Sequence, residues 1–259
     1  LRAGTEAAAP YCRWCGAPDA LFRCGACGGR RLRAVVVGAK RTAEELGRAF
    51  PDVPVLSSGG SHVLSEVDAK PALVVATPGA EPVAAAGYGA ALLLDGWALL
   101  GRADLRAGEE ALRRWMAAAA LVRPAGAGGR VVVMAESALQ PVQALVRWDP
   151  AWHAGQELAA RTELGFPPAA RMASVDGVPD AVAAFLDELE LPESGEILGP
   201  VPLGEADHSG QSERERALLR VPRSDGRALA AALAATQAVR TARKELDPVR
   251  VQLDPLELI

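Results

Sequence analysis

Residues 71–79 read PALVVATPG, a short apolar run closed by turn residues. This pattern is typical of a strand that is buried on both faces. Similar runs follow at 87–97 (GYGAALLLDGW) and 128–136 (GGRVVVMAE), and amphipathic helix patterns occur at 40–50 and 103–122. Apolar strands that alternate with helices predict an α/β domain with a doubly wound parallel sheet.

Two more strands are expected before this run, at 32–38 and, as an edge strand, at 51–58. Thr42 is expected to be the N-cap of the first helix, with a glutamate three residues later completing a capping box. Asp104 is the expected N-cap of the second helix. Three tryptophans are expected to lie in the core: Trp97, Trp115 and Trp148.

The composition changes near residue 146, where a predicted helix at 149–165 leads to the Pro167–Pro168 pair that ends it. Beyond it we expect the strands 170–176, 195–199, 215–222 and 248–253, and the helices 179–189 and 225–243. This βαββαβ order predicts a ferredoxin-like α+β domain at the C-terminus.

All four cysteines of the chain, Cys12, Cys15, Cys24 and Cys27, form two Cys-x-x-Cys pairs within YCRWCGAPDALFRCGACGG (11–29). Two thiolate knuckles supply the four soft ligands of a tetrahedral Zn²⁺ site, and a glycine after each pair suits the tight turn. A redox pair and four inert buried thiols are the alternatives. We expect a zinc ribbon, which is mostly a structural element.

Composition limits the function classes. The 259 residues are 50% hydrophobic, enough for one large or two ordinary domains, and there is neither an apolar run of membrane-spanning length nor a signal peptide. We therefore expect a cytosolic protein. Residues 1–33 carry a net charge of +4 although the whole chain carries −4, so a basic zinc region could contact nucleic acid; a solvated arginine face is the equal alternative.

Motifs for catalysis are missing from the sequence. It holds no phosphate-binding G-x-x-x-x-G-K-[ST] loop, and its three histidines lie far apart in no triad-like context. No catalytic residue is predicted.

The order of these parts resembles the PriA family of replication-restart proteins (primosomal protein N-prime) over nearly the whole chain. The stretches that carry the resemblance are CRWC…CGAC (12–27), GAKRTAEELGRAFPDVPV (38–55), ADLRAGEEALRRW (103–115), ELAARTELGFPPAARMA (157–173), EILGPVP (196–202) and VRVQLDPLE (249–257). The resemblance implies a cysteine-rich zinc-binding region at 1–33, a second helicase lobe at 34–146, and a connecting helix with the C-terminal domain at 147–259.

Departures from the family's helicase motifs bear on activity. The stretch 76–89 lacks the Lys and Asp of the family's motif, and Ala118, Val122 and Ala125 stand where the family has a Gln and the two Arg of its arginine-finger motif. Arg123 is one residue out of register. An arginine finger can contribute about 10³-fold or more in rate. We therefore expect a helicase-like protein without helicase activity; the alternative is an active ATP-dependent 3′–5′ DNA helicase with divergent motifs.

The resemblance also implies the partners and the zinc pairing. The expected partners are forked and single-stranded DNA, primosome proteins, single-stranded-DNA-binding protein and the machinery that loads the replicative helicase, in the cytoplasm at the nucleoid. In the family, interleaved pairing would place the two cysteine pairs on different zinc ions, with further cysteines upstream; for this chain alone we expect one shared Zn²⁺. The candidate DNA contacts are Arg13, Arg23, Arg30, Arg31, Arg240, Arg243 and Lys244.

Overall fold

The computed structural model describes residues 22–23, 28–29, 38–94, 96–102, 104–203, 214–256 and 258. The four cysteines, residues 32–37 of the strand expected at 32–38, and Arg13, Arg30 and Arg31 lie outside these residues. The described residues fall into two compact units. Of the described residues, those of 38–102 and 106–153 belong to the first unit, and those of 154–258 belong to the second, together with 22–23, 28–29, 104 and 105.

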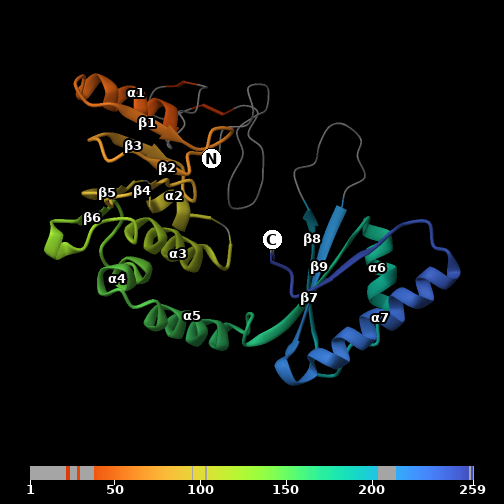
Figure 1. Cartoon of the computed structure of the whole chain (residues 1–259). Coiled ribbons are helices and arrows are strands. Elements are labelled where there is room, and N and C mark those ends of the chain that lie inside the picture. Colours follow the sequence, from red (N-terminus) through yellow and green to blue (C-terminus); the bar gives the residue numbers. More distant parts are fainter. Residues whose placement is uncertain are drawn as a thin grey trace. The chain divides into compact units, whose positions relative to one another are not determined.

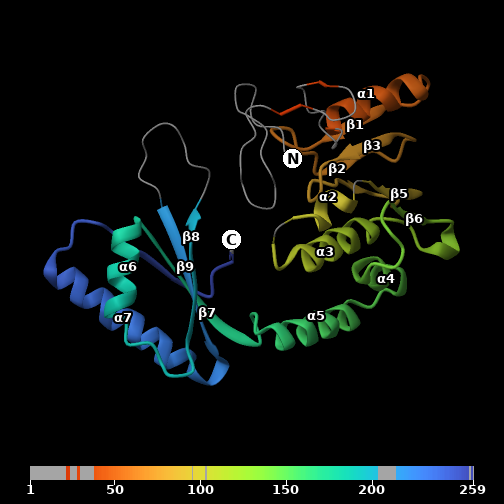
Figure 2. The same cartoon turned by 180° about the vertical axis from the view of Figure 1, so that it is seen from behind.

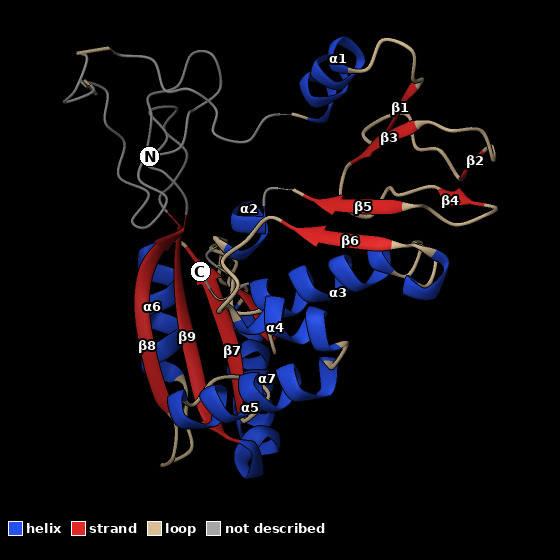
Figure 3. Ribbon diagram, turned by 90° about the vertical axis from the view of Figure 1, so that its left-hand side faces the viewer, coloured by secondary structure: helices blue, strands red, loops and turns tan. Residues whose placement is uncertain are grey.

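The strands of the first unit form three parallel pairs (Figure 3). They are β1 (Val55–Ser58) with β3 (Leu73–Ala76), β2 (Glu66–Val67) with β4 (Val83–Ala84), and β5 (Ala90–Leu93) with β6 (Arg130–Val133). The parallel α/β expectation is confirmed in this coarse sense. Among the described residues the backbone hydrogen bonds make three two-stranded sheets, and a single continuous helicase-lobe sheet is not seen.

The helices of this unit are α1 (Ala39–Ala49), α2 (Gly96–Leu100), α3 (Ala107–Ala119) and α4 (Gln140–Arg147), with a short 3₁₀ turn η1 (Ala125–Ala127). Both predicted N-caps are wrong. Helix α1 begins three residues before Thr42, whose hydroxyl donates back to the Gly38 carbonyl at 3.5 Å. Helix α3 has Arg106 at its N-cap, two residues after Asp104. Helix α4 was not predicted, because Pro141 and the short length hid its pattern.

The core of the first unit lies around Trp115, which is 3% exposed and packs with Leu112 and Leu145. The prediction for Trp115 is therefore confirmed, whereas Trp97 and Trp148 are 44% and 53% exposed. Trp148 ends α4 in the left-handed conformation at φ 55°, so it caps the helix and does not continue its buried stripe.

Helix α5 (Pro150–Leu164) runs from the first unit into the second (Figure 1). It is followed by Gly165 at φ +69° and the predicted proline pair. The side chain of Arg161 is 5% exposed and donates to the carbonyls of Leu105 at 3.0 Å and Pro167 at 3.3 Å. This buried guanidinium therefore satisfies one carbonyl in the turn before α3 and one in the turn after α5.

The second unit has the predicted βαββαβ order. Its elements are β7 (Ala170–Gly177), α6 (Pro179–Glu188), β8 (Glu196–Leu203), β9 (Arg214–Pro222), η2 (Arg223–Asp225), α7 (Gly226–Arg243) and β10 (Arg250–Leu253). The sheet order is β10-β7-β9-β8 and all its pairings are antiparallel, which confirms the ferredoxin-like arrangement. Helices α6 and α7 lie on the same side of the sheet in Figures 1 and 2.

Between sheet and helices lies an apolar core that includes Phe185, Val182 and Leu219, each fully buried, with Leu229 of α7. The guanidinium of Arg240 lies 5.9 Å from the centre of the Phe185 ring. Phe185 therefore joins both helices to the sheet.

We expect Phe185→Ala to lower the unfolding free energy of the second unit by about 3–5 kcal/mol, because the cavity and the lost burial both weaken the core. Four of the five tryptophans of the chain, at 97, 115, 148 and 152, lie in the first unit, so tryptophan fluorescence reports mainly on that unit while far-UV circular dichroism reports on both. Urea unfolding should show an earlier dichroism transition and an unchanged fluorescence transition. The matched control, Leu112→Ala, should move the fluorescence transition instead; a common shift of both probes would contradict the division into two units.

Candidate functional site

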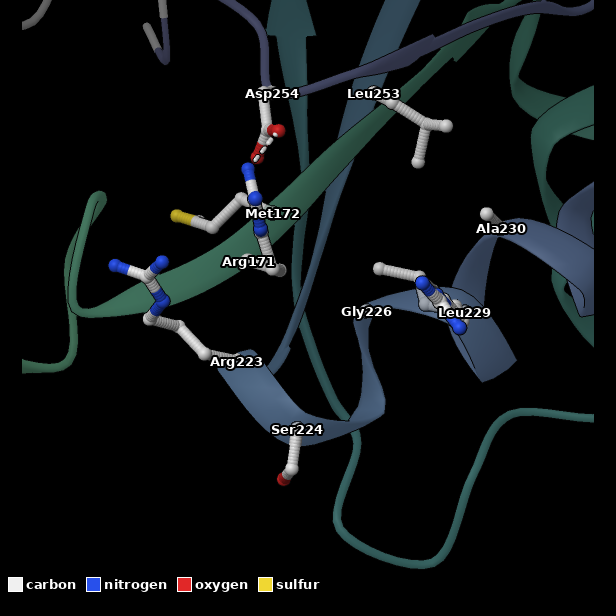
Figure 4. A pocket seen from close by; sticks show the side chains of 10 residues that line it. Arg171, Met172, Arg223, Ser224, Gly226, Leu229, Ala230, Leu253 and Asp254 are labelled. Atoms are coloured by element: carbon white, nitrogen blue, oxygen red, sulfur yellow. Dashed lines mark hydrogen bonds and ion pairs between the residues drawn. The ribbon is translucent and has the colours of Figure 1, made fainter.

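A pocket of about 500 Å³ opens at one end of the second unit (Figure 4). It is lined by Arg171, Met172, Arg223, Ser224, Gly226, Arg227, Leu229, Ala230, Leu253 and Asp254. These residues come from the start of β7, from η2 and the first turn of α7, and from the end of β10. Three arginines from two distant segments therefore gather around one opening.

The positive charge of this pocket exceeds its negative charge. Arg171 forms an ion pair with Asp254 at 2.5 Å, drawn as a dashed line in Figure 4. Arg223 donates to the carbonyl of Pro168 at 3.2 Å, and within the part of the chain that the structure describes neither Arg223 nor Arg227 has a carboxylate in ion-pair range. Two exposed guanidinium groups are thus available to an anion.

The N-terminus of α7 also lines this pocket, where the ionised carboxylate of Asp225 offsets part of the positive potential. Asp225 is its N-cap residue, yet its side chain makes no capping hydrogen bond to the helix. The hydroxyl groups of Ser194 and Ser224 donate to the Asp225 carboxylate instead and hold its pKa below the usual range. The first N–H groups of an 18-residue helix therefore remain as donors beside the arginines.

A glycine permits the close contact between strand and helix here. A Cβ atom at Gly226 would lie 2.8 Å from Cγ of Arg171. A larger residue would push Arg171 away from α7 and widen the pocket.

The remaining walls of the pocket are apolar. Met172 and Leu229 are fully buried, and Leu253 is 50% exposed at the rim. The chemistry of the pocket is therefore mixed: arginines and helix N–H groups for an anion, and hydrocarbon for an apolar group attached to it. No acid–base or nucleophilic arrangement accompanies them.

The basic residues predicted on α7 lie at the other end of that helix. Arg240 is 5% exposed, pairs with Glu245 at 2.6 Å, and stacks over Phe185, so its burial counts against a contact with phosphate. Arg243 is exposed but ion-paired with Glu188, and Lys244 is the exposed C-cap residue. DNA contacts by these residues, and by the exposed Arg23, stay predictions.

Sequence reasoning missed the arginine pocket. Arg171 and Arg223 are separated by 52 positions, and only the sheet pairing brings their segments together. The stretch PRSDGR (222–227) was the available signal, because it joins a strand to a helix start with two arginines.

The stretch 76–81, which departs from the helicase motif, forms a turn after β3. The Gly79 amide donates to both carboxylate oxygens of Glu81, at 3.0 and 2.9 Å. Arg114 on α3 donates to the Pro78 carbonyl at 2.9 Å and pairs with Glu110 at 2.5 Å. Hydrogen bonds from Arg113 and Arg114 lower the pKa of Glu110 to about 2. This turn is therefore held by residues of its own unit.

Two of the three positions aligned with the arginine-finger motif are part of the unit's own structure, and the third, Ala125, is exposed in η1. Ala118 is 8% exposed within α3, and Val122 pairs with Tyr88 as an isolated β-bridge. The side chain of Arg123 lies beside the glycines that precede β5, since a Cβ atom at Gly89 would lie 2.9 Å from its Nη2.

No group of three or more His, Cys, Asp or Glu side chains is arranged to hold a metal among the residues whose structure is described. The zinc prediction concerns cysteines outside them. None of the described helices is both long and apolar enough to cross a membrane.

Residues 162–256 match the family model described as "Primosomal protein N C-terminal domain". The chain is 56% identical over 252 residues to the probable replication restart protein PriA of Mycobacterium leprae, a match that covers 95% of this chain and 39% of the relative. It is 54% identical over 267 residues to the corresponding protein of Mycobacterium tuberculosis, covering 98% of this chain and 41% of that protein. The chain thus spans about two fifths of the length of the curated relatives it matches. It belongs to the PriA family of replication restart proteins.

Proposed function

We propose that the chain acts in replication restart, as a binding and assembly part of a PriA-type protein that recognises stalled forks. The similarity to two replication restart proteins over nearly the whole chain carries this proposal. The arginine pocket supports it, because a pocket without catalytic groups suits recognition better than chemistry. Forked DNA and primosome proteins are the proposed partners.

The pocket has a specific role in this proposal: it binds a partner protein through an acidic peptide end. A DNA strand needs an open basic track for successive phosphates. Here the guanidinium groups of Arg223 and Arg227 stand beside the buried Leu229 and the rim residue Leu253. A carboxylate next to an apolar side chain matches both parts of this lining, and single-stranded-DNA-binding protein is the proposed source of such a peptide.

Replacing Arg223 and Arg227 together by Gln should weaken binding of a fluorescent Asp- and Phe-rich peptide with a free C-terminal carboxylate by about tenfold or more, since charge-assisted hydrogen bonds are lost. Fluorescence anisotropy with the purified chain measures this. Arg250→Gln, an exposed arginine of the same unit outside the pocket, is the matched control and should have no effect. Unchanged peptide binding, or an equal loss of forked-DNA binding, would contradict the peptide role.

We also propose that the chain does not support a helicase motor. The lack of the motif's two arginines at positions 122 and 125, and of its glutamine at 118, supports this, as does the turn at 76–81, in which the Gly79 amide donates to the Glu81 carboxylate. Phosphoryl transfer would then lack the charge that stabilises its transition state. The alternative remains an ATP-dependent 3′–5′ helicase that uses divergent motifs.

The inactive motor and the active helicase can be distinguished in a chimera in which this chain replaces the matched part of the Mycobacterium leprae PriA. We expect ATP hydrolysis in the chimera that forked DNA does not raise above the rate without DNA. Steady-state phosphate release measures both rates. A clear rise in turnover on adding fork DNA would favour the helicase alternative.

Zinc is part of the same proposal. Four cysteines in two Cys-x-x-Cys pairs suit a structural Zn²⁺ site, whose binding free energy of about 10–16 kcal/mol can fold the region around it. We expect the purified chain to contain about one zinc per molecule by metal analysis, in line with one shared site. Replacing Cys12 and Cys24 by Ser, one from each pair, should abolish it; zinc retained in that variant would contradict the shared site.

A further inference from the structure

One face of the β5–β6 pair in the first unit carries exposed apolar side chains. Leu92 and Val132 are direct partners in the parallel register and are 64% and 46% exposed. The next residues on the same face, Leu94 and Met134, are 48% and 59% exposed. The Met134 amide donates to the Leu93 carbonyl at 2.9 Å, so the pairing continues to that point.

The other face of these strands is largely covered, although Val131 on it is 39% exposed. Leu93, Val133 and Ala135 pack against the cluster that contains Trp115 and Leu112. Figures 1 and 3 show α3 and α4 together on one side of β5 and β6. Because side chains alternate along a strand, residues one position earlier or later must point away from this layer.

Sheets made of parallel strands are normally covered by helices on both faces, because the crossover connections place helices there. A contiguous exposed apolar area on such a pair indicates a packing surface. The exposed face is as apolar as the covered one, with leucine, valine and methionine and no charged residue until Arg130 at the start of β6. A sheet face of this composition normally packs against a second layer of helices.

We propose that Leu92, Leu94, Val132 and Met134 form the docking surface for an amphipathic helix from the part of a PriA-type protein that lies outside this chain. The length of the relatives supports this occupant, because about three fifths of each lies outside the match. The helix presents an apolar stripe to the four side chains and an acidic residue to Arg130, which lies on the same face and is exposed. The inference rests on membership of the family and not on the pocket or the motor.

Methionine oxidation tests this without a substitution. The chain has three methionines, of which Met134 is 59% exposed and Met172 is fully buried. Peroxide converts an accessible methionine to its sulfoxide, and mass spectrometry follows each residue. In the chain alone, Met134 should oxidise at least tenfold faster than Met172.

In the Mycobacterium leprae chimera described above, oxidation of Met134 should slow at least tenfold while Met172 is unchanged. Met134 that stays reactive in the chimera would overturn the proposal. Protection already in the chain alone would overturn it too: protection that grows with concentration would mean a second copy on this face, and protection independent of concentration would mean cover by the chain itself.

A paired substitution gives a second measurement. Leu92→Gln with Val132→Gln should leave the Tm of the isolated chain unchanged or higher, but should lower the Tm of the chimera by several degrees. Leu158→Gln with Leu164→Gln, two exposed leucines of α5, serves as the matched control with no such difference. Equal shifts of Tm in chain and chimera would overturn the proposal.

Discussion

The antiparallel register between β7 and β9 is the constraint on which the second unit depends. Eight pairs run from Ala170 opposite Pro222 to Gly177 opposite Glu215. This register places the start of β7 beside the turn that follows β9, so that Arg171 meets the first turn of α7 at Gly226. A slip of one residue would turn Val175 and Ala173 away from Phe185 and would also separate the arginines of the pocket. Core and pocket therefore depend on the same hydrogen bonds.

The arginines of this unit fall into two groups: some are buried in ion pairs, and others are exposed at the pocket. Arg216 pairs with Asp176 across the sheet at 2.8 Å, with both side chains largely buried, and Arg240 is buried against Glu245. In such pairs each buried charge already has its counter-ion, so neither group is accessible to a charged group of a partner. Arg223 and Arg227 differ, because they are exposed and have no carboxylate partner among the described residues. Exposure and pairing, more than the number of arginines, decide which of them can bind an anion.

The first unit combines a retained scaffold with altered motif positions. Its strands pair in parallel and Trp115 is buried as in an ordinary α/β layer, while Ala118 is buried in α3 and Val122 forms a β-bridge with Tyr88. Arg114 and Glu81 hold the turn after β3. One apolar face of β5 and β6 is left exposed by the described residues of this unit. The relatives are longer than this chain, and their additional length is the proposed source of the helix that covers this face.

The sequence by itself determined the alternation of strands and helices, the βαββαβ order of the second unit and the family, since these follow from local apolar periodicity and extended similarity. It also predicted the burial of Trp115. The N-cap predictions at Thr42 and Asp104 were wrong, because a cap depends on where the backbone enters the helix. The core predictions for Trp97 and Trp148 were wrong too, because an apolar side chain does not show whether another element packs over it. Only the tertiary structure decided that Arg240 is buried and that Arg171, Arg223 and Arg227 share a pocket. The physical reason is that strand register and helix packing join residues from distant segments, and no local pattern in the chain records those distances.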